Sequence, residues 1–115
     1  VIVTGDFNVE EDNPAVLYLQ GKYAFAGEAG EQSDSQVVLR DSFRVLHPDV
    51  TEVGTFNGFK GRSEGGKIDY IFVSPGIEVR GAEIIHTQKA GRYPSDHFPV
   101  ASYVFLPGDR KEEEP

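Results

Sequence analysis

The stretch KIDYIFVS, residues 67–74, tells more about the fold than any other segment of the sequence. Its apolar and aromatic residues, followed by a proline–glycine pair at 75–76, predict a buried β-strand that ends in a turn. Asp69 lies inside this apolar run, and a buried carboxylate is costly unless it is paired or hydrogen-bonded. The segment therefore predicts a central strand and, in addition, a partner for Asp69.

His97 is the partner that we expect for Asp69. The chain has three histidines. His47 precedes a proline at an expected helix end and His86 lies in an expected edge strand, so we place both at the surface. A carboxylate fixes the tautomer of a neighbouring imidazole and raises its pKa. An Asp69–His97 pair is the expectation.

Further strands flank this segment on both sides. β-Branched and aromatic runs predict a buried strand at 1–5, an extended segment at 77–88 with a bulge at Gly81, and a last strand at 98–106. Because the three later strands follow one another, we expect them to form the sheet-rich part of the chain.

Helices are expected only between the first strand and the later ones. Asn13 before Pro14 is typical of a helix start, and predicts a short helix over 15–20 that Gly21 ends. A second helix is expected over 37–46, ending at His47–Pro48. The polar and glycine-rich residues 27–35 and 51–66 predict loops. The fold class is therefore mixed α/β, of the α+β type.

Length and composition favour a single globular domain. The chain has 115 residues, which we divide into a domain at 1–107 and an acidic tail at 108–115. No apolar run approaches the ~20 residues that cross a bilayer, and the first residues do not resemble a signal peptide. The absence of cysteine excludes disulfides, zinc–thiolate sites and cysteine nucleophiles. It fits a cytoplasmic location and leaves secretion open.

The charge balance bears on the substrate. Asp and Glu total 19 against 11 Lys and Arg, a net charge of −8, with no basic patch. Surfaces that bind long nucleic acids are basic, so a small molecule, a nucleotide or a lipid head group is favoured over duplex DNA. Any metal must bind through Asp, Glu, Asn or His, and carboxylates favour Mg²⁺, Mn²⁺ or Ca²⁺.

Polar residues interrupt apolar strands at three places. They are GDFN at 5–8, the carboxylate of Asp69, and SDHFP at 95–99. Side chains at strand ends converge from distant sequence, so the three places are expected to form one site. Each also has a structural reading: Asp6 and Asn8 as an Asx turn, and Asp96 as a loop cap.

The motifs GDFN, GTFNGF (54–59), KIDYIFVS and SDHFPV (95–100), in this order, resemble the C-terminal half of the endonuclease/exonuclease/phosphatase superfamily. The resemblance extends to about residue 106, and DSFRVLHPD (41–49) points toward its bacterial members. It implies a metal-dependent phosphoesterase with a deoxyribonuclease-I-like fold. Such a chain would form the C-terminal half of a two-sheet, four-layer α/β sandwich.

The resemblance also implies roles for individual residues. Asp6 would orient or deprotonate the attacking water, and Asn8 would hydrogen-bond the scissile phosphate. Asp69 would hold His97, which would face the phosphate and stabilise its charge. Asp96 would contribute to a Mg²⁺ or Mn²⁺ site.

Asn57 marks a departure from the family, because many relatives have histidine at this position. A substrate-binding role and a loop-shaping role for Asn57 both stay open.

The first half of the family's sequence, with its glutamate metal ligand, has no counterpart in these residues. The resemblance thus implies an active parent protein and an inactive isolated chain. Its partner would be the missing N-terminal half, or a second copy bound through an exposed sheet face. A non-catalytic interaction module is the alternative function. A calcium loop at 10–12 has the acids but not the EF-hand spacing.

Overall fold

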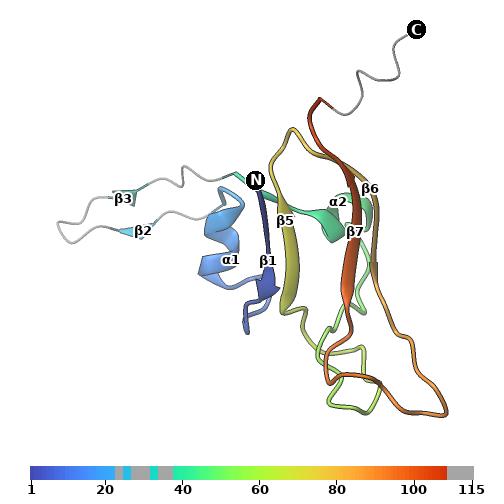
Figure 1. Ribbon diagram of the computed structural model, residues 1–115. Coiled ribbons are helices and arrows are strands. Elements are labelled where there is room, and N and C mark those ends of the chain that lie inside the picture. The colour runs from blue at the N-terminus through green and yellow to red at the C-terminus, as the bar shows by residue number, and fades with distance from the viewer. Residues whose placement is uncertain (23–24, 27–31, 34–37, 109–115) are drawn as a thin grey trace, which may run out of the picture.

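The computed structural model describes residues 1–22, 25–26, 32–33 and 38–108. Most of the expected loop at 27–35 and of the expected tail at 108–115 lies outside these residues. Figure 1 shows the order of the elements. They are β1 (Ile2–Asp6), α1 (Pro14–Leu19), β2 (Phe25–Ala26), β3 (Gln32–Ser33), β4 (Arg40–Asp41), α2 (Ser42–Leu46), β5 (Asp69–Val73), β6 (Glu78–Ile84) and β7 (Val100–Phe105).

Two antiparallel sheets carry the described fold, and β2 and β3 form a separate short pair. In the first sheet β5 lies between β1 and β4. In the second, β6 pairs with β7, and the register shifts between Val79 and Gly81. The bulge expected at Gly81 is therefore confirmed. This α+β arrangement agrees with the fold class expected from the sequence and is compatible with a part of the larger sandwich.

β5 is the buried centre of the fold, as the KIDYIFVS stretch predicts. Tyr70, Phe72 and Val73 are at most 1% exposed. Tyr70 and Phe72 pack with Val16 of α1 and with Leu39. Each such side chain contributes about 1.5–3 kcal/mol by leaving water. Helix α2 contacts both β5 and β6 and so joins the two sheets.

The expectation that residues 1–5 form a buried strand is wrong in its burial. β1 is a strand, but it pairs only with β5, and Val1 and Ile2 are 77% and 46% exposed. Its apolar sequence matches that of a covered strand, yet among the described residues β1 is an edge strand that pairs on one side only.

The helix expected over 37–46 is also wrong in its first half. Arg40 and Asp41 instead pair with Val73 and Phe72 of β5 as strand β4. The helix begins only at Ser42, because the Asp41 side chain accepts a hydrogen bond from the Phe43 N–H at 3.1 Å and caps it. The helical spacing of apolar residues at 38–46 concealed this strand-to-helix change.

The first expected helix is confirmed. The Asn13 side chain accepts from the Ala15 N–H at 2.9 Å, Pro14 begins α1, and Gly21 follows its end with a φ of 73°. Across the described residues, none of the helices has the length and apolar character needed to cross a membrane.

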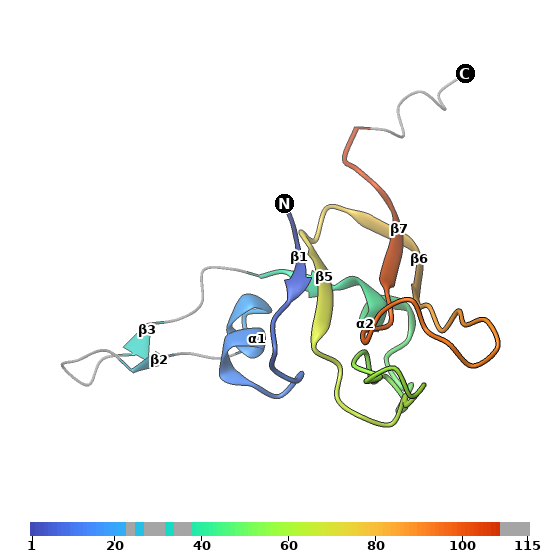
Figure 2. The ribbon, with the colours of Figure 1, turned by 60° about the horizontal axis from the view of Figure 1, so that its bottom comes forward.

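Two loops meet at one end of the sheets and build the site described next. The loop before β5 and the loop before β7 lie side by side in Figure 2, where this end comes forward. Phe56 and His97 form an antiparallel bridge between them, and the Phe98 N–H donates to the Thr55 carbonyl at 2.7 Å.

Candidate active site

Asp6, Asp69 and His97 converge at this end of the fold. Asp6 ends β1, Asp69 begins β5, and the antiparallel register places them directly opposite each other. His97 approaches from the loop before β7. One potential ligand atom of each residue lies within 4.8 Å of the other two. The three line an open cavity of about 260 Å³ together with Ser95 and Tyr70.

The expected pairing of Asp69 with His97 is present. His97 Nδ1 donates to Asp69 Oδ2 at 2.8 Å, since an ionised carboxylate only accepts. The Asp69 side chain is 15% exposed, so its carboxylate is largely shielded from water. The hydrogen bond from the His97 imidazole compensates for the lost hydration. With Nδ1 held in this way, His97 Nε2 faces Asp6, whose Oδ2 lies 3.6 Å away.

These acids make His97 a stronger base than an isolated histidine. The hydrogen bond to Asp69 raises the pKa of His97 above its ordinary value, partial burial works against this, and the charges of Asp69, Asp6 and Asp96 add to the increase. The protonated imidazole offsets the repulsion between two carboxylates that face each other across neighbouring strands. The cavity thus presents a fixed N–H donor with cationic character beside two anionic oxygens.

Asp6 also forms the Asx turn that its sequence allows. Its Oδ1 accepts the Asn8 N–H at 3.0 Å, and Asn8 has a φ of 58°. The turn and the site are compatible, because it engages one carboxylate oxygen and leaves Oδ2 facing His97. The Asn8 side chain is exposed and is not among the groups that line the 260 Å³ cavity, so its phosphate-binding role stays a prediction.

Thr55 ties the segments of Asp69 and His97 together. It is fully buried. Its Oγ1 accepts the N–H groups of Ile68 and Asp69 at 3.0 and 3.2 Å, while its carbonyl accepts the N–H of Phe98. Sequence reasoning missed this residue, because a threonine before an aromatic residue carries no local signal for such a role.

A buried ion pair supports Asp69 from the other side. Lys67 Nζ lies 2.9 Å from Asp41 Oδ2, and both side chains are at most 3% exposed. The same ammonium donates to the Asp69 carbonyl at 3.0 Å and lies 3.9 Å from the centre of the Tyr70 ring. Burial lowers the pKa of Lys67 and the Asp41 charge opposes this. A lysine inside a strand as apolar as KIDYIFVS signals a buried acid, and the sequence reasoning did not use that signal.

Asp96 and Asn57 lie beside the convergence rather than in it. The Asp96 carboxylate is not a member of the three-residue group, and its carbonyl accepts the N–H groups of Asn57 and Gly58. Asn57 is 2% exposed, and its Oδ1 accepts the Phe59 N–H at 2.6 Å. These contacts support a loop-shaping part for Asn57. The metal role of Asp96 and the substrate role of Asn57 stay predictions.

Comparison with known proteins places this site in a family. The profile of the Endonuclease/Exonuclease/phosphatase family matches residues 1–97. The chain belongs to this family. The resemblance expected from the sequence motifs is thus confirmed, and the three convergent residues lie within the matched region. Members of the endonuclease/exonuclease/phosphatase family are generally hydrolytic nucleases or phosphatases and are typically dependent on a divalent metal.

A solved structure shares the fold. The chain is similar to a functionally unknown conserved protein from Enterococcus faecalis V583, with a TM-score of 0.65 and 26% sequence identity over 91% of this chain. The match covers 36% of that protein, so the chain spans about a third of its length. No curated protein matches the chain.

The donor set fits a divalent cation of the kind typical of the endonuclease/exonuclease/phosphatase family. Asp6 and Asp69 offer carboxylate oxygens, which Mg²⁺ and Mn²⁺ prefer. The Nδ1 atom of His97 is engaged by Asp69, so Nε2 is the ring nitrogen that faces the cavity. Asp69, through the oxygen that is not bonded to His97, would hold the metal, while Asp6 Oδ2 and His97 Nε2 face the cavity.

Proposed function

We propose that the chain supplies one part of the active site of a Mg²⁺- or Mn²⁺-dependent phosphoesterase, which hydrolyses a phosphodiester or phosphomonoester by in-line attack of water. The single observation that carries this proposal is the geometry of His97, a donor with a raised pKa fixed at 2.8 Å by Asp69 and facing Asp6 across an open cavity. In-line displacement at phosphorus needs an oriented water and positive charge on the phosphate oxygens.

The residues divide these tasks between them. Asp6 Oδ2 orients the attacking water and accepts its proton, while the new bond from the water oxygen to phosphorus forms. His97 donates a hydrogen bond from Nε2–H to a nonbridging phosphate oxygen. The bond between phosphorus and the ester oxygen breaks on the opposite side, and this oxygen leaves as an oxyanion that takes a proton from solvent. Asp69 keeps His97 protonated and oriented. A bound divalent cation supplies additional positive charge to the phosphate. Asn8 is proposed to contact the phosphate and Asp96 the metal, as the family resemblance implies. A substrate contact of Asn57 is proposed separately, because the family has histidine at this position in many members.

The proposed substrate is a small phosphoester, a nucleotide or a lipid head group. The net charge of −8 supports this choice over duplex DNA. We propose further that the 115-residue chain alone is inactive, because the family's glutamate metal ligand has no counterpart in it. The absence of cysteine supports a cytoplasmic location.

The test is hydrolysis of bis-p-nitrophenyl phosphate by the full-length protein that carries these residues, with Mg²⁺ and with EDTA. His97→Ala is expected to lower kcat/KM by about 10²–10³-fold, as the loss of one positioned donor to a developing oxyanion does. The matched control is His86→Ala, since His86 is exposed and lies outside the three-residue group. Equal activity of the His97 and His86 variants would contradict the proposal.

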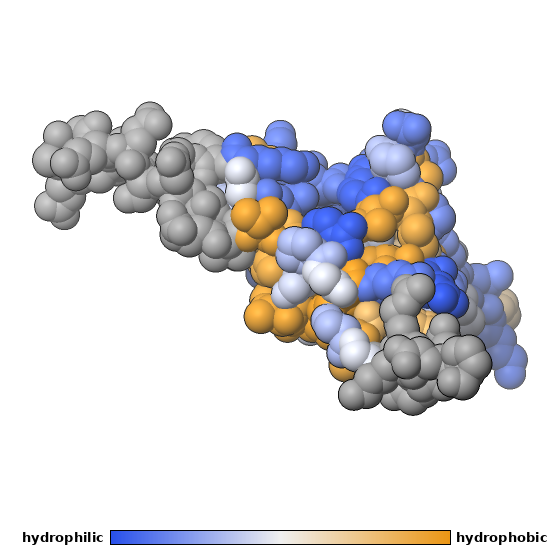
Figure 3. Space-filling view, turned by 90° about the horizontal axis from the view of Figure 1, so that it is seen from above, coloured by the Kyte–Doolittle hydropathy of each residue, from blue (hydrophilic) through white to orange (hydrophobic). Residues whose placement is uncertain are grey.

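A non-catalytic interaction module is the second candidate, and the exposed apolar side chains favour it. Val1, Tyr103 and Leu106 are 77%, 67% and 46% exposed. Figure 3 shows apolar side chains gathered in patches on the face seen from above. Such surfaces mark interfaces in soluble proteins. We propose that the remaining part of the fold or a second copy of the chain covers these exposed side chains. Light scattering of the 115-residue chain is expected to show a dimer, and a stable monomer at high micromolar concentration would contradict it.

A further inference from the structure

A second cavity lies next to the candidate active site. It has a volume of about 340 Å³, and its lining includes Phe56, Asn57, Lys60, Arg62 and Glu64. Phe56 connects the two cavities, because its ring lies edge-on to the His97 ring with 5.4 Å between the centroids. Phe56 therefore lines the second cavity and also contacts His97 of the first.

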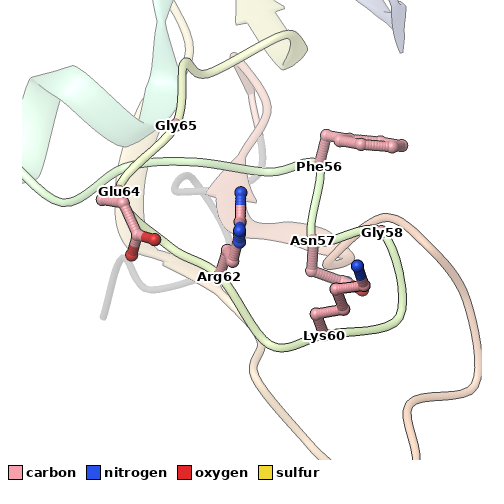
Figure 4. A pocket seen from close by; sticks show the side chains of 7 residues that line it. All are labelled: Phe56, Asn57, Gly58, Lys60, Arg62, Glu64 and Gly65. Carbon is pink, nitrogen blue, oxygen red and sulfur yellow. The ribbon is translucent and has the colours of Figure 1, made fainter.

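The cavity concentrates positive charge in an otherwise acidic chain. Lys60 and Arg62 both line it, and neither forms an ion pair with any of the described residues. Figure 4 shows their nitrogen ends within the curve of the loop that runs from Phe56 to Gly65. Glu64 is the one acid in the lining, so the residues that line the cavity have a net charge of about +1, whereas the net charge of the whole chain is −8.

The loop that presents these cations is already ordered. The Asn57 N–H donates to the Asp96 carbonyl at 2.7 Å, and the Asn57 Oδ1 holds the Phe59 N–H. Asn57 is 2% exposed, so the residue at the base of this loop is held inside the fold. A preorganised loop binds an anion without first losing its own conformational freedom.

We propose that this cavity binds a second phosphate group of the substrate, next to the phosphate that is hydrolysed. Lys60 and Arg62 are the cations that hold it, and Phe56 is the wall between the two phosphate positions. The inference rests on the proposed function and narrows its substrate to phosphoesters that carry a second phosphate. Contacts between these cations and phosphate are charge-assisted hydrogen bonds, which are stronger than hydrogen bonds between neutral groups.

The experiment uses inorganic pyrophosphate as the probe and the ¹⁵N-labelled 115-residue chain in EDTA, so that neither metal nor turnover is involved. Amides of residues 58–65 are expected to shift on titration. Lys60→Ala/Arg62→Ala is expected to weaken binding by about tenfold or more. Lys89→Ala/Arg92→Ala is the charge-matched control, because both residues are exposed and neither lines the cavity. The control is expected to change binding by less than about twofold, as screened distant charges do.

Equal weakening by the two double variants would overturn the proposal, because net charge alone would then explain binding. Absence of shifts at residues 58–65 would overturn it as well. Failure of the hydrolysis test with His97→Ala concerns the proposed function instead, and the two failures are distinguishable because the pyrophosphate titration involves no hydrolysis. In the full-length protein, the cavity variant is expected to lose kcat/KM by a larger factor toward a substrate with two phosphates than toward bis-p-nitrophenyl phosphate. Equal loss toward both would also overturn the proposal.

Discussion

Asp41→Asn tests the buried ion pair beneath the site. Asparagine has nearly the shape of aspartate, and its side-chain oxygen still accepts from the Phe43 N–H that caps α2. The substitution removes the negative charge that faces Lys67 Nζ at 2.9 Å, and it replaces the oxygen that accepts from this ammonium by an NH2 group that cannot accept. It leaves a buried ammonium without its counter-charge.

The expected loss of unfolding free energy follows from this burial. Both side chains are at most 3% exposed, so water cannot replace the missing partner. Removing one member of a buried pair costs about 3–5 kcal/mol. Asp41→Ala would lose this free energy and also the cap of α2, which makes its total loss about 1 kcal/mol larger. A domain of this kind has a total unfolding free energy of about 5–15 kcal/mol. We therefore choose Asp41→Asn, because the variant with the smaller loss keeps more of the folded state for measurement.

The assay is urea unfolding followed by circular dichroism. Asp41→Asn and Lys67→Met are each expected to lose about 3–5 kcal/mol, and the double variant less than their sum, since it buries no unpaired charge. Glu78→Gln is the control, in a pair whose side chains are 36% and 47% exposed, and its loss is expected to stay below about 1 kcal/mol. A loss for Asp41→Asn no larger than that of the control, or strict additivity in the double variant, would refute the reasoning.

Three further predictions concern the site and α1. The raised pKa of His97 contributes stability that is fully present below pH 6.5 and is lost as the pH rises through the raised value. Asp69→Asn is expected to reduce this pH dependence and to lower the pKa of His97 in an NMR titration, because it removes the largest of the effects that raise the pKa. An unchanged pKa would contradict it. Thr55→Val leaves the Ile68 and Asp69 N–H groups without an acceptor and is expected to lower the free energy of unfolding by about 1–3 kcal/mol. Thr55→Ser retains the oxygen and is expected to keep most of the stability. Equal losses in the two variants would contradict this prediction. Asn13→Ala removes the cap of α1 and is expected to cost about 1 kcal/mol in the same unfolding assay, and no loss would show that the cap is dispensable.

The sequence was enough to predict the centre of the fold and its key contact. The apolar residues of KIDYIFVS predict a buried strand without reference to any other segment. A carboxylate inside such a strand needs a hydrogen-bonding or charged partner, whatever the topology of the other strands. With three histidines in the chain, and two expected at the surface, His97 was the remaining choice. The Asn13–Pro14 cap was equally local and was predictable for that reason.

Features that depend on distant partners were not predictable. Arg40 and Asp41 form a strand only because β5 offers them an edge, and no local pattern encodes that pairing. The exposure of β1 was not predictable for the same reason. An apolar strand is predicted to be buried whether or not another surface covers it. Thr55 acquires its role from two segments, at residues 68–69 and at residue 98, that only the tertiary fold brings to it.

The measurement that tests the central claim most directly is a double-mutant cycle on Asp69 and His97 in the full-length protein. The assay is Mg²⁺-dependent hydrolysis of bis-p-nitrophenyl phosphate. Because Asp69 acts through the 2.8 Å hydrogen bond to His97, Asp69→Asn, His97→Ala and the double variant are expected to lose similar factors in kcat/KM, with the double variant far from additive. Additive losses, or full activity in His97→Ala, would contradict the assignment of these residues to one catalytic site.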